Sequence, residues 1–262
     1  MPNIAIASRK GGVGKTTTTS NLAVCFAEQL RLRVLAIDID PQGHTTKGLG
    51  IEVDPAIGSG AYHVLRYGAP ISSVVSTTPW GVDVLTGGGD LRQADEYLRS
   101  EGGAEFHLRQ ALEQRALEAD PYDVVLMDCP PQFGRLSVAA LLAASSVICP
   151  VTLDALALDG LAELHAEIRK LVRLRINPEL RLGAVLEMRT RPPSKTSAGA
   201  KIIHAELVKS ASGLLLRGTI RESDHLAPAW NAGVPITTYK GTSNGARDYR
   251  ALAHELRERG LA

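Results

Sequence analysis

The stretch Lys-Gly-Gly-Val-Gly-Lys-Thr-Thr at residues 10–17 decides the fold, because it follows the apolar run Ile4–Ala7 and precedes a helical pattern. A glycine-rich turn between a buried strand and a helix is typical of a phosphate-binding loop. Lys15 supplies a charge for the β- and γ-phosphates, and the Thr16 hydroxyl is a ligand for Mg²⁺. The sequence therefore predicts a nucleoside triphosphate site, whose candidate binding residues are Lys10, Gly11, Gly12, Val13, Gly14, Lys15, Thr16 and Thr17.

Two carboxylates, Asp38 and Asp40, follow the next apolar run and stand just before Pro41. Residues two apart on an ideal strand point to the same face, so we expect both carboxylates to face the nucleotide. A carboxylate in this position can bind hydrated Mg²⁺ or orient the water that attacks the γ-phosphate. The alternative is that both aspartates only open a turn before the proline. The neighbouring phosphate loop favours the catalytic interpretation.

A third carboxylate, Asp128, ends the apolar run Val124–Met127. An acidic residue at the end of a buried strand is typical of a Walker B segment, in which the aspartate holds Mg²⁺, usually through water. A lone aspartate at a strand end is often only a capping or turn residue. Because two other parts of a phosphate site are already present, we predict that Asp128 and Thr16 hold the metal.

Short apolar runs alternate with longer amphipathic stretches, which is typical of parallel strands covered by helices on both faces. We therefore predict an α/β fold with a doubly wound, mostly parallel sheet and with ligands at the carboxyl ends of the strands. The predicted strands are Asn3–Ala7, Val34–Ile37, Val82–Leu85, Val124–Met127, Val147–Val151, Leu182–Leu186 and Leu214–Thr219. The predicted helices are Thr16–Gln29, Phe106–Glu118, Leu158–Arg173, Ile202–Ser210 and Ala246–Arg259, and Arg189–Gly199 is predicted to be a mobile loop.

The composition is that of a compact enzyme rather than a globally basic nucleic-acid binder. The 262 residues can bury a large core, and 29 Lys plus Arg against 28 Asp plus Glu give a formal net charge of +1. Three cysteines without C-x-x-C spacing favour neither a disulfide framework nor a metal site. The sequence shows no secretory leader and no apolar stretch of membrane length, so we expect a cytoplasmic protein.

The string Lys-Gly-Gly-x-Gly-Lys-Thr-Thr resembles the deviant Walker A motif of the ParA/MinD class of P-loop ATPases; the ordinary motif has a glycine where this chain has Arg9. The resemblance implies that Lys10 reaches across a dimer interface to the phosphates of the partner's nucleotide. Residues 38–42 resemble switch I of the class, which implies a water-positioning role for Asp40 and a supporting, metal-side role for Asp38. Residues 130–134 resemble switch II in location. The implied catalytic residues are Lys10, Lys15 and Asp40.

The resemblance extends over nearly the whole chain and is to ParA partition ATPases of the short form, without a helix-turn-helix extension before residue 1. It implies one P-loop ATPase domain over residues 1–262, with ATP and Mg²⁺ as cofactors. It also implies an ATP-bound homodimer that binds double-stranded DNA without sequence preference, a ParB-type centromere-binding protein that stimulates hydrolysis, and a place on the nucleoid. The chain departs from the family at residues 187–191 and 220–223, so the adenine contacts are not assigned.

A DNA-binding patch requires a local excess of basic residues, since the whole chain is nearly neutral. Such an excess occurs between residues 189 and 221. In a dimer, the basic patches of the two subunits would join into one longer patch. The affinity for DNA rises with each DNA phosphate that is neutralised. The candidates are Arg189, Arg191, Lys195, Lys201, Arg217 and Arg221, together with Lys209, Lys240 and Arg247.

Three alternatives share the fold. A MinD-like ATPase that cycles on membranes requires a terminal amphipathic helix with bulky apolar residues, whereas Leu252–Ala262 has no aromatic residue and mixes both charge signs; we expect no stable membrane association. An iron–sulfur carrier requires paired cysteines at a dimer interface, which Cys25, Cys129 and Cys149 do not supply convincingly. An orphan ParA that positions a protein cargo on the nucleoid stays open.

Overall fold

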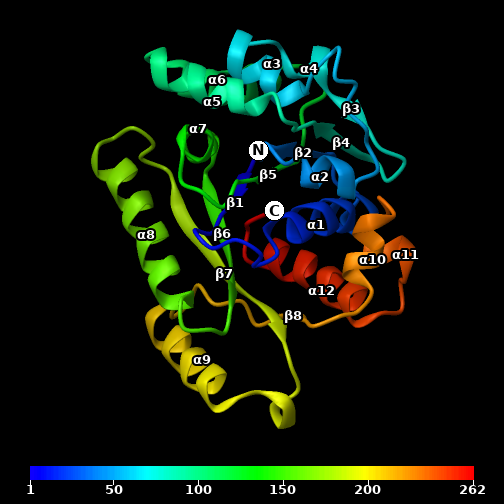
Figure 1. Ribbon diagram of the computed structural model, residues 1–262, viewed down its shortest axis with the longest axis vertical. Helices are drawn as coiled ribbons and strands as arrows, with labels where there is room; N and C mark the ends of the chain where they lie inside the picture. Colours follow the sequence, from blue (N-terminus) through cyan, green and yellow to red (C-terminus); the bar gives the residue numbers. More distant parts are fainter.

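A computed structural model describes all 262 residues and shows one eight-stranded sheet with helices on both faces (Figure 1). The strand order is β3-β4-β2-β5-β1-β6-β7-β8, and every neighbouring pair is parallel except β3 and β4. The strands are β1 (Asn3–Ile6), β2 (Val34–Asp38), β3 (Ser76–Thr77), β4 (Val82–Leu85), β5 (Val124–Asp128), β6 (Ser146–Thr152), β7 (Arg181–Thr190) and β8 (Ile220–Arg221). The predicted doubly wound fold is therefore confirmed.

The helices divide between the two faces of the sheet, and α1 and α12 pack together on one of them (Figure 1). The α-helices are α1 (Lys15–Leu30), α2 (His44–Gly48), α3 (Gly60–Tyr67), α4 (Ile71–Val74), α5 (Leu91–Ser100), α6 (His107–Arg115), α7 (Arg135–Ala143), α8 (Ala157–Arg173), α9 (Ala198–Ser210), α10 (Leu226–Asn231), α11 (Ile236–Tyr239) and α12 (Asn244–Glu258). Two 3₁₀ turns, η1 (Ala104–Phe106) and η2 (Pro193–Lys195), complete the set.

The central strands are buried on both faces because alternate residues enter two separate cores. In β1, Ile4 and Ile6 pack against α1 and α12, whereas Ala5 belongs to the core beneath α3, α5, α6, α7 and α8. One face of α12 is apolar and packs on the core: Tyr249, Leu252, Ala253 and Leu256 are all buried. No helix is both long enough and apolar enough to cross a membrane.

The parallel arrangement brings the carboxyl ends of β1, β2 and β5 to one edge of the sheet. β5 lies between β1 and β2, and the register sets Asp38 directly beside Asp128. The loop after β1 carries the phosphate-binding motif and leads into α1. In doubly wound sheets, ligands bind outside this edge, so three sequence-distant segments meet at one place.

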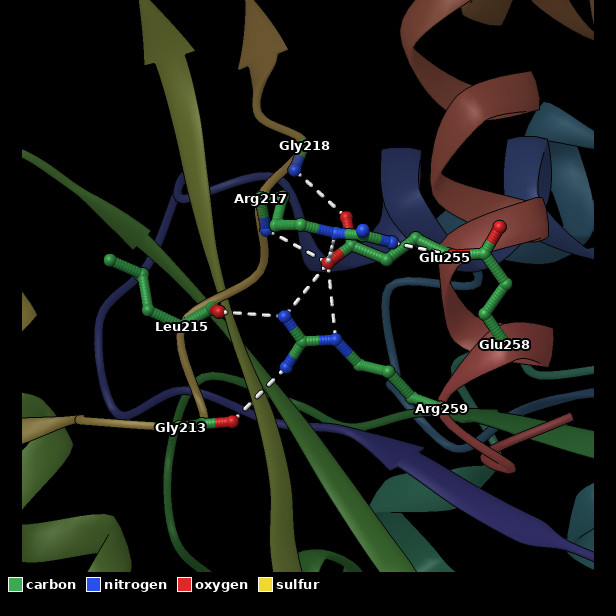
Figure 2. Close-up of polar contacts among 7 residues, drawn as sticks. All are labelled: Gly213, Leu215, Arg217, Gly218, Glu255, Glu258 and Arg259. Atoms are coloured by element: carbon green, nitrogen blue, oxygen red, sulfur yellow. Dashed lines mark hydrogen bonds and ion pairs between the residues drawn. The ribbon is translucent and has the colours of Figure 1, made fainter.

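Six of the seven predicted strands are confirmed within a few residues, but the strand predicted at Leu214–Thr219 is wrong. This segment makes only an isolated bridge at Leu215. After Leu216, whose N–H donates to Val185 of β7, the next two amides leave the sheet: the buried Glu255 carboxylate of α12 accepts hydrogen bonds from the backbone N–H groups of Arg217 and Gly218, both at 2.8 Å (Figure 2). The apolar run resembles a strand in composition, but a side chain far along the sequence takes two of its backbone N–H groups.

Two further expectations are corrected by the structure. The predicted loop Arg189–Gly199 is partly ordered secondary structure, because β7 continues to Thr190 and α9 begins at Ala198, where the Ser197 side chain caps the helix. In addition, α2, α3, α5 and α7 were not predicted. The apolar residues of α3 (Ala61, Val64 and Leu65) and of α5 (Leu91, Ala94 and Leu98) do recur at helical spacing, whereas the five residues of α2 are too few to show a period.

Candidate nucleotide-binding site

The loop between β1 and α1 has the backbone shape of a phosphate cradle. Gly12 and Gly14 take positive φ values of 73° and 97°, which glycine adopts without steric cost. Gly14 is the N-cap of α1, and no side chain caps the helix there. The amides of the first turn therefore remain free to bind an anion, and the helix dipole favours one.

A methionine supports the loop from below. A Cβ atom at Gly14 would lie 2.6 Å from Cε of Met188, at the end of β7, so the loop packs directly on this side chain. The Thr18 hydroxyl of α1 contacts both the Met188 sulfur, at 3.8 Å, and the Tyr249 hydroxyl, at 3.4 Å. Buried contacts among α1, β7 and α12 therefore support the phosphate-binding loop.

Lys15 is almost fully buried at the base of a pocket of ≈ 810 Å³ that the loop helps to line. Its Nζ donates to the backbone oxygen of Lys10 at 3.2 Å. Burial lowers the pKa of Lys15, while the charge of Asp128 and, to a lesser extent, that of Asp40 oppose this effect. The geometry places an ammonium group where phosphate oxygens would meet the first turn of α1.

Asp128 has one carboxylate oxygen that is bonded and one that is buried without a partner. Its Oδ2 accepts hydrogen bonds from the hydroxyls of Thr16 and Thr45, both at 2.7 Å, whereas Oδ1 has none. Burial, followed by the charge of Asp38, raises the pKa of Asp128 to about 7. A buried carboxylate oxygen without a partner is costly, and a hydrated Mg²⁺ beside Thr16 would remove that cost. The donor set, a carboxylate and a hydroxyl, suits magnesium.

Asp38 is fully buried, and both of its oxygens are engaged within the chain. Oδ2 accepts from the backbone N–H and the hydroxyl of Thr46, both at 2.8 Å, and Oδ1 accepts from the N–H of Asp40 at 3.2 Å. Burial raises the pKa of Asp38 to about 6, and the hydrogen bonds from Thr46 oppose this. Asp38 thus anchors α2 to the end of β2; its metal-side role remains a prediction.

Asp40 lines the pocket, whereas Asp38 is buried beside Asp128 behind it, so the two carboxylates do not share one face as an ideal strand would place them. β2 ends at Asp38, and the chain then turns, with the N–H of Gly43 bonded to the backbone oxygen of Asp40 at 2.9 Å. The alternation of an ideal strand therefore does not continue to Asp40. Its Oδ1 accepts from the N–H of Gln42 at 2.9 Å, which leaves Oδ2 free to accept a proton from water.

Lys10 turns away from this pocket within its own subunit. Its Nζ forms an ion pair with Asp154 and a hydrogen bond with the Thr152 hydroxyl at 3.2 Å. Thr152 ends β6, and Asp154 lies just before α8. Both the side chain of Lys10 and that of Asp154 are about one-third exposed, at 33% and 39%, so the contact lies at the surface.

One wall of the pocket was not predicted. The polar face of α5 lines it with Arg92, Asp95, Glu96 and Arg99, spaced three and four residues apart. This helical stripe after Gly87–Gly89 is the sequence signal that could have revealed the wall. Asp95 also accepts from the N–H of Leu136, at the start of α7, at 3.4 Å. The wall therefore connects α5 to the segment that follows Pro130–Gly134.

A tryptophan from the carboxyl-terminal part of the chain packs against α2. Trp230 of α10 donates from Nε1 to the backbone oxygen of His44 at 2.9 Å, and its ring meets the His44 ring edge-on at 5.3 Å. The Lys47 ammonium lies 5.0 Å from the centre of the Trp230 ring. The helix that follows Asp40 is thus held both by Asp38 and by the carboxyl-terminal part of the chain.

The structure separates the six main DNA-binding candidates into three groups; of the other three, Lys209 pairs with Glu206, and Lys240 and Arg247 are exposed without an ion pair. Arg189 lines the nucleotide pocket while remaining exposed. Arg191, Arg217 and Arg221 each pair with a carboxylate, of Glu222, Glu258 and Asp248 respectively. Lys195 and Lys201 are exposed and form no ion pair, so each keeps a charge that is free for a phosphate. DNA contact by these residues stays a prediction.

The three cysteines are unpaired and buried. Burial raises the pKa of Cys25 and of Cys149 to about 12, and it raises the pKa of Cys129 as well. Because none of the thiols reaches the surface, none lies where two subunits could share a cluster. The alternative of an iron–sulfur carrier therefore has no support in the geometry.

Comparisons with known proteins agree with the geometry. Residues 1–182 match the family model described as "AAA domain". The chain is 37% identical over 258 residues to the sporulation initiation inhibitor protein Soj of Bacillus subtilis, covering 98% of both proteins. It is 38% identical over 256 residues to the chromosome-partitioning ATPase Soj of Thermus thermophilus, covering 98% of this chain and 95% of that protein.

A solved structure shares both the fold and part of the sequence. Cobyrinic acid a,c-diamide synthase from Mycobacterium smegmatis, crystallised with a bound ATP analogue and magnesium, superposes with a TM-score of 0.82 at 29% identity, covering 100% of this chain and 96% of that one. Together with its full-length likeness to the Soj proteins, this shows that the chain belongs to the ParA/Soj-type partition ATPases of the P-loop class.

Proposed function

We propose that this chain is a Mg²⁺-dependent DNA-segregation ATPase that binds DNA non-specifically as an ATP-bound dimer and releases it on hydrolysis. The observation that carries the proposal is the buried Oδ1 of Asp128, which lacks a partner beside Thr16 at the mouth of the phosphate loop. Support comes from the Soj relatives and from the solved structure that contains an ATP analogue and magnesium. We further propose that residues 1–262 act as one domain.

In this mechanism the phosphate loop and Lys15 hold the triphosphate by charge and by backbone N–H groups. Thr16 and Asp128 would hold Mg²⁺, which would supply charge neutralisation for the phosphates. Asp40 orients the attacking water and accepts its proton. Asp38 keeps α2, and with it Asp40, in place. Phosphoryl transfer depends on positioning and charge neutralisation, which this arrangement supplies.

Dimerisation completes the site in this proposal. Lys10 leaves Asp154 and approaches the phosphates bound by the other subunit, so that assembly depends on the nucleotide. Lys195 and Lys201 of both subunits then form one surface for DNA phosphates. A ParB-type partner accelerates hydrolysis and resets the cycle, and the protein is expected on the nucleoid.

The test is retention of the purified protein on duplex DNA with ATP, with ADP and without nucleotide. We expect retention with ATP alone, loss of nucleotide binding in Lys15→Ala, and persistent retention in Asp40→Ala, because that variant binds ATP but does not orient the water. Equal retention in all three nucleotide states would contradict the proposal. Normal turnover by Asp40→Ala would show that another group positions the water.

No observation favours the MinD-like alternative. The apolar residues of α12 are buried against α1 and β8, so the last helix presents no bulky apolar face for a lipid surface. The DNA experiment is run beside sedimentation with anionic vesicles in the same nucleotide states. Sedimentation with vesicles that depends on ATP, without DNA retention, would favour the membrane-cycling ATPase instead.

A further inference from the structure

A groove of ≈ 950 Å³ lies between α8 and the beginning of β7. One wall is the carboxyl-terminal half of α8, from His165 to Arg173, and the other is formed by Leu180–Leu182 and Leu214. β7 begins at Arg181, so the groove lies at the amino ends of the strands, whereas the nucleotide pocket lies at their carboxyl ends. Figure 1 shows α8 and α9 along one flank of the molecule, remote from α1 and α12.

The floor of the groove is apolar. Ile168, Leu180 and Leu182 are buried there, and the half-buried Val172 and Leu214 border them. None of these side chains offers a hydrogen bond. A floor of this kind favours apolar side chains of a ligand, because their burial removes apolar surface from water.

The rim of the groove is basic, and its arginines have no partners. Arg169 and Arg173 stand one helical turn apart on α8, and Arg181 lies on the opposite wall. None of the three forms an ion pair or a side-chain hydrogen bond. The one acidic residue that lines the groove, Glu167, is 3.5 Å from the ammonium group of Lys170. The three guanidinium groups are thus available for carboxylates, which they bind in pairs of hydrogen bonds.

We propose that this groove docks a short acidic amphipathic helix of a partner protein. The wall from His165 to Arg173 extends about 12 Å along the helix axis, which matches roughly two turns of a second helix. Such a helix has apolar residues at positions i, i+3 or i+4 and i+7, flanked by Glu or Asp. Its apolar residues pack on the floor of the groove, and its carboxylates neutralise the arginines of the rim. Duplex DNA would satisfy the arginines only, because its phosphate backbone has no apolar group to bury.

The groove shares no residue with the nucleotide pocket, so docking requires neither ATP nor hydrolysis. This separates the proposal from the proposed ATPase cycle. A protein that has lost nucleotide binding through Lys15→Ala still binds the acidic helix. A protein that has lost the groove arginines still binds ATP.

The test uses a fluorescein-labelled designed peptide of about 14 residues, roughly four helical turns, with Leu at the i, i+3 or i+4 and i+7 positions and Glu beside them. Fluorescence anisotropy with the full chain is expected to give a micromolar Kd with and without ATP. The double variant Arg169→Glu/Arg173→Glu is expected to weaken binding at least about tenfold. Arg257→Glu is the matched control, because Arg257 is exposed on α12, forms no ion pair and lies on the other face of the sheet; it should bind as the wild type does. Circular dichroism checks that each variant is folded.

Three results would overturn the proposal. The first is no binding of the peptide by the wild type. The second is equal binding of a peptide in which every Leu is replaced by Ser, because the apolar floor would then play no part. The third is a labelled DNA duplex that binds in dependence on Arg169 and Arg173 while the peptide does not, which would make the rim a nucleic-acid surface.

Discussion

Lys10 is held in its own subunit, and this contact competes with any contact across a dimer interface. The ion pair with Asp154 is partly exposed, so it contributes at most about 1 kcal/mol. We predict that Asp154→Asn makes ATP-dependent dimerisation up to about thirtyfold tighter, because two Lys10 side chains, one from each subunit, are then released at lower cost. Light scattering over a range of protein concentrations with ATP measures this dimerisation.

Lys10→Ala is the companion variant for this experiment, and we expect it to form no ATP-dependent dimer. Thr152 also contacts Lys10, so Thr152→Val should move the dimer affinity in the same direction as Asp154→Asn, but less. A weaker dimer in Asp154→Asn would show that the aspartate supports assembly instead of competing with it.

Gly87 lies against the backbone of Asp38 and leaves no room for a side chain. A Cβ atom there would be 2.5 Å from the backbone oxygen of Asp38, and the N–H of Gly87 donates to the Thr46 hydroxyl at 2.8 Å. We predict that Gly87→Ala lowers the free energy of unfolding by about 1–3 kcal/mol and displaces α2, with loss of ATPase activity. Urea denaturation and phosphate release measure the two effects.

Gly102→Ala is the control for Gly87→Ala, because no atom lies within 4 Å of a Cβ at Gly102. We expect that substitution to change the free energy of unfolding by less than about 0.5 kcal/mol. Full ATPase activity in Gly87→Ala would contradict the view that this close approach positions α2.

Single residues were predictable where a short motif carries the chemistry. The phosphate loop, Asp128 and Asp40 follow from strand ends and local spacing, and the structure brings these residues together. Asp154 and Thr46 could not be predicted in the same way, because each acts through a partner that only the folded chain brings near.

At the level of elements, Glu255 connects α12 to the segment that precedes β8 (Figure 2). Its carboxylate binds two backbone N–H groups and the guanidinium of Arg259, which also reaches the backbone oxygens of Gly213 and Leu215. We predict that Glu255→Gln lowers the free energy of unfolding by about 1–3 kcal/mol, because an amide presents one acceptor where the carboxylate presents two. Urea denaturation at pH 7 measures this loss.

The effect of Glu255 depends on pH with a definite sign. Burial opposes its ionisation, but the N–H groups of Arg217 and Gly218 and the charge of Arg259 outweigh burial and lower its pKa. A carboxyl group whose pKa is lowered by folding stabilises the protein above its unfolded pKa, near 4.5, and loses this effect as the pH falls through the folded pKa. The difference between wild type and Glu255→Gln should therefore be constant from pH 7 to about 5 and shrink below about 4.5. A constant difference down to pH 3 would contradict this assignment.

The central elements were predictable because buried parallel strands consist of continuous apolar runs, as in Val124–Met127. The segment Leu214–Thr219 has the same composition, and composition does not show that Glu255 takes up its amides. The short edge strands β3 and β8 have two residues each and leave no periodic signal.

For the whole molecule, near neutrality means that DNA affinity rests on a few unpaired charges. Lys195 and Lys201 give four such charges per dimer, and each phosphate contact changes the slope of log K against log salt by about 0.9. We predict that Lys195→Ala/Lys201→Ala makes this slope shallower by roughly 4 units for the ATP-bound dimer. DNA retention at several salt concentrations measures the slope.

Arg191→Ala is the matched control for the lysine variant, because the charge of Arg191 is already paired with Glu222. We expect that substitution to change the slope by clearly less than the double lysine variant does. An equal change would show that the ion pair opens on DNA and that Arg191 contacts phosphate as well.

The overall architecture followed from the alternation of apolar runs and amphipathic stretches, since right-handed crossovers leave few ways to arrange them. The wall of the nucleotide pocket formed by α5 and the groove beside α8 could not be predicted from this alternation. Both depend on which helix faces are left uncovered after the layers pack, and this is a property of the complete fold.

The contact between Trp230 and α2 makes the fluorescence of this tryptophan sensitive to the position of the helix. The chain has only two tryptophans, and the indole of Trp230 touches His44 and Lys47, a few residues beyond Asp40. Any displacement of that short helix alters the surroundings of the ring and hence its emission. With Trp80 replaced by Phe, stopped-flow fluorescence would time the nucleotide-driven rearrangement in unlabelled protein.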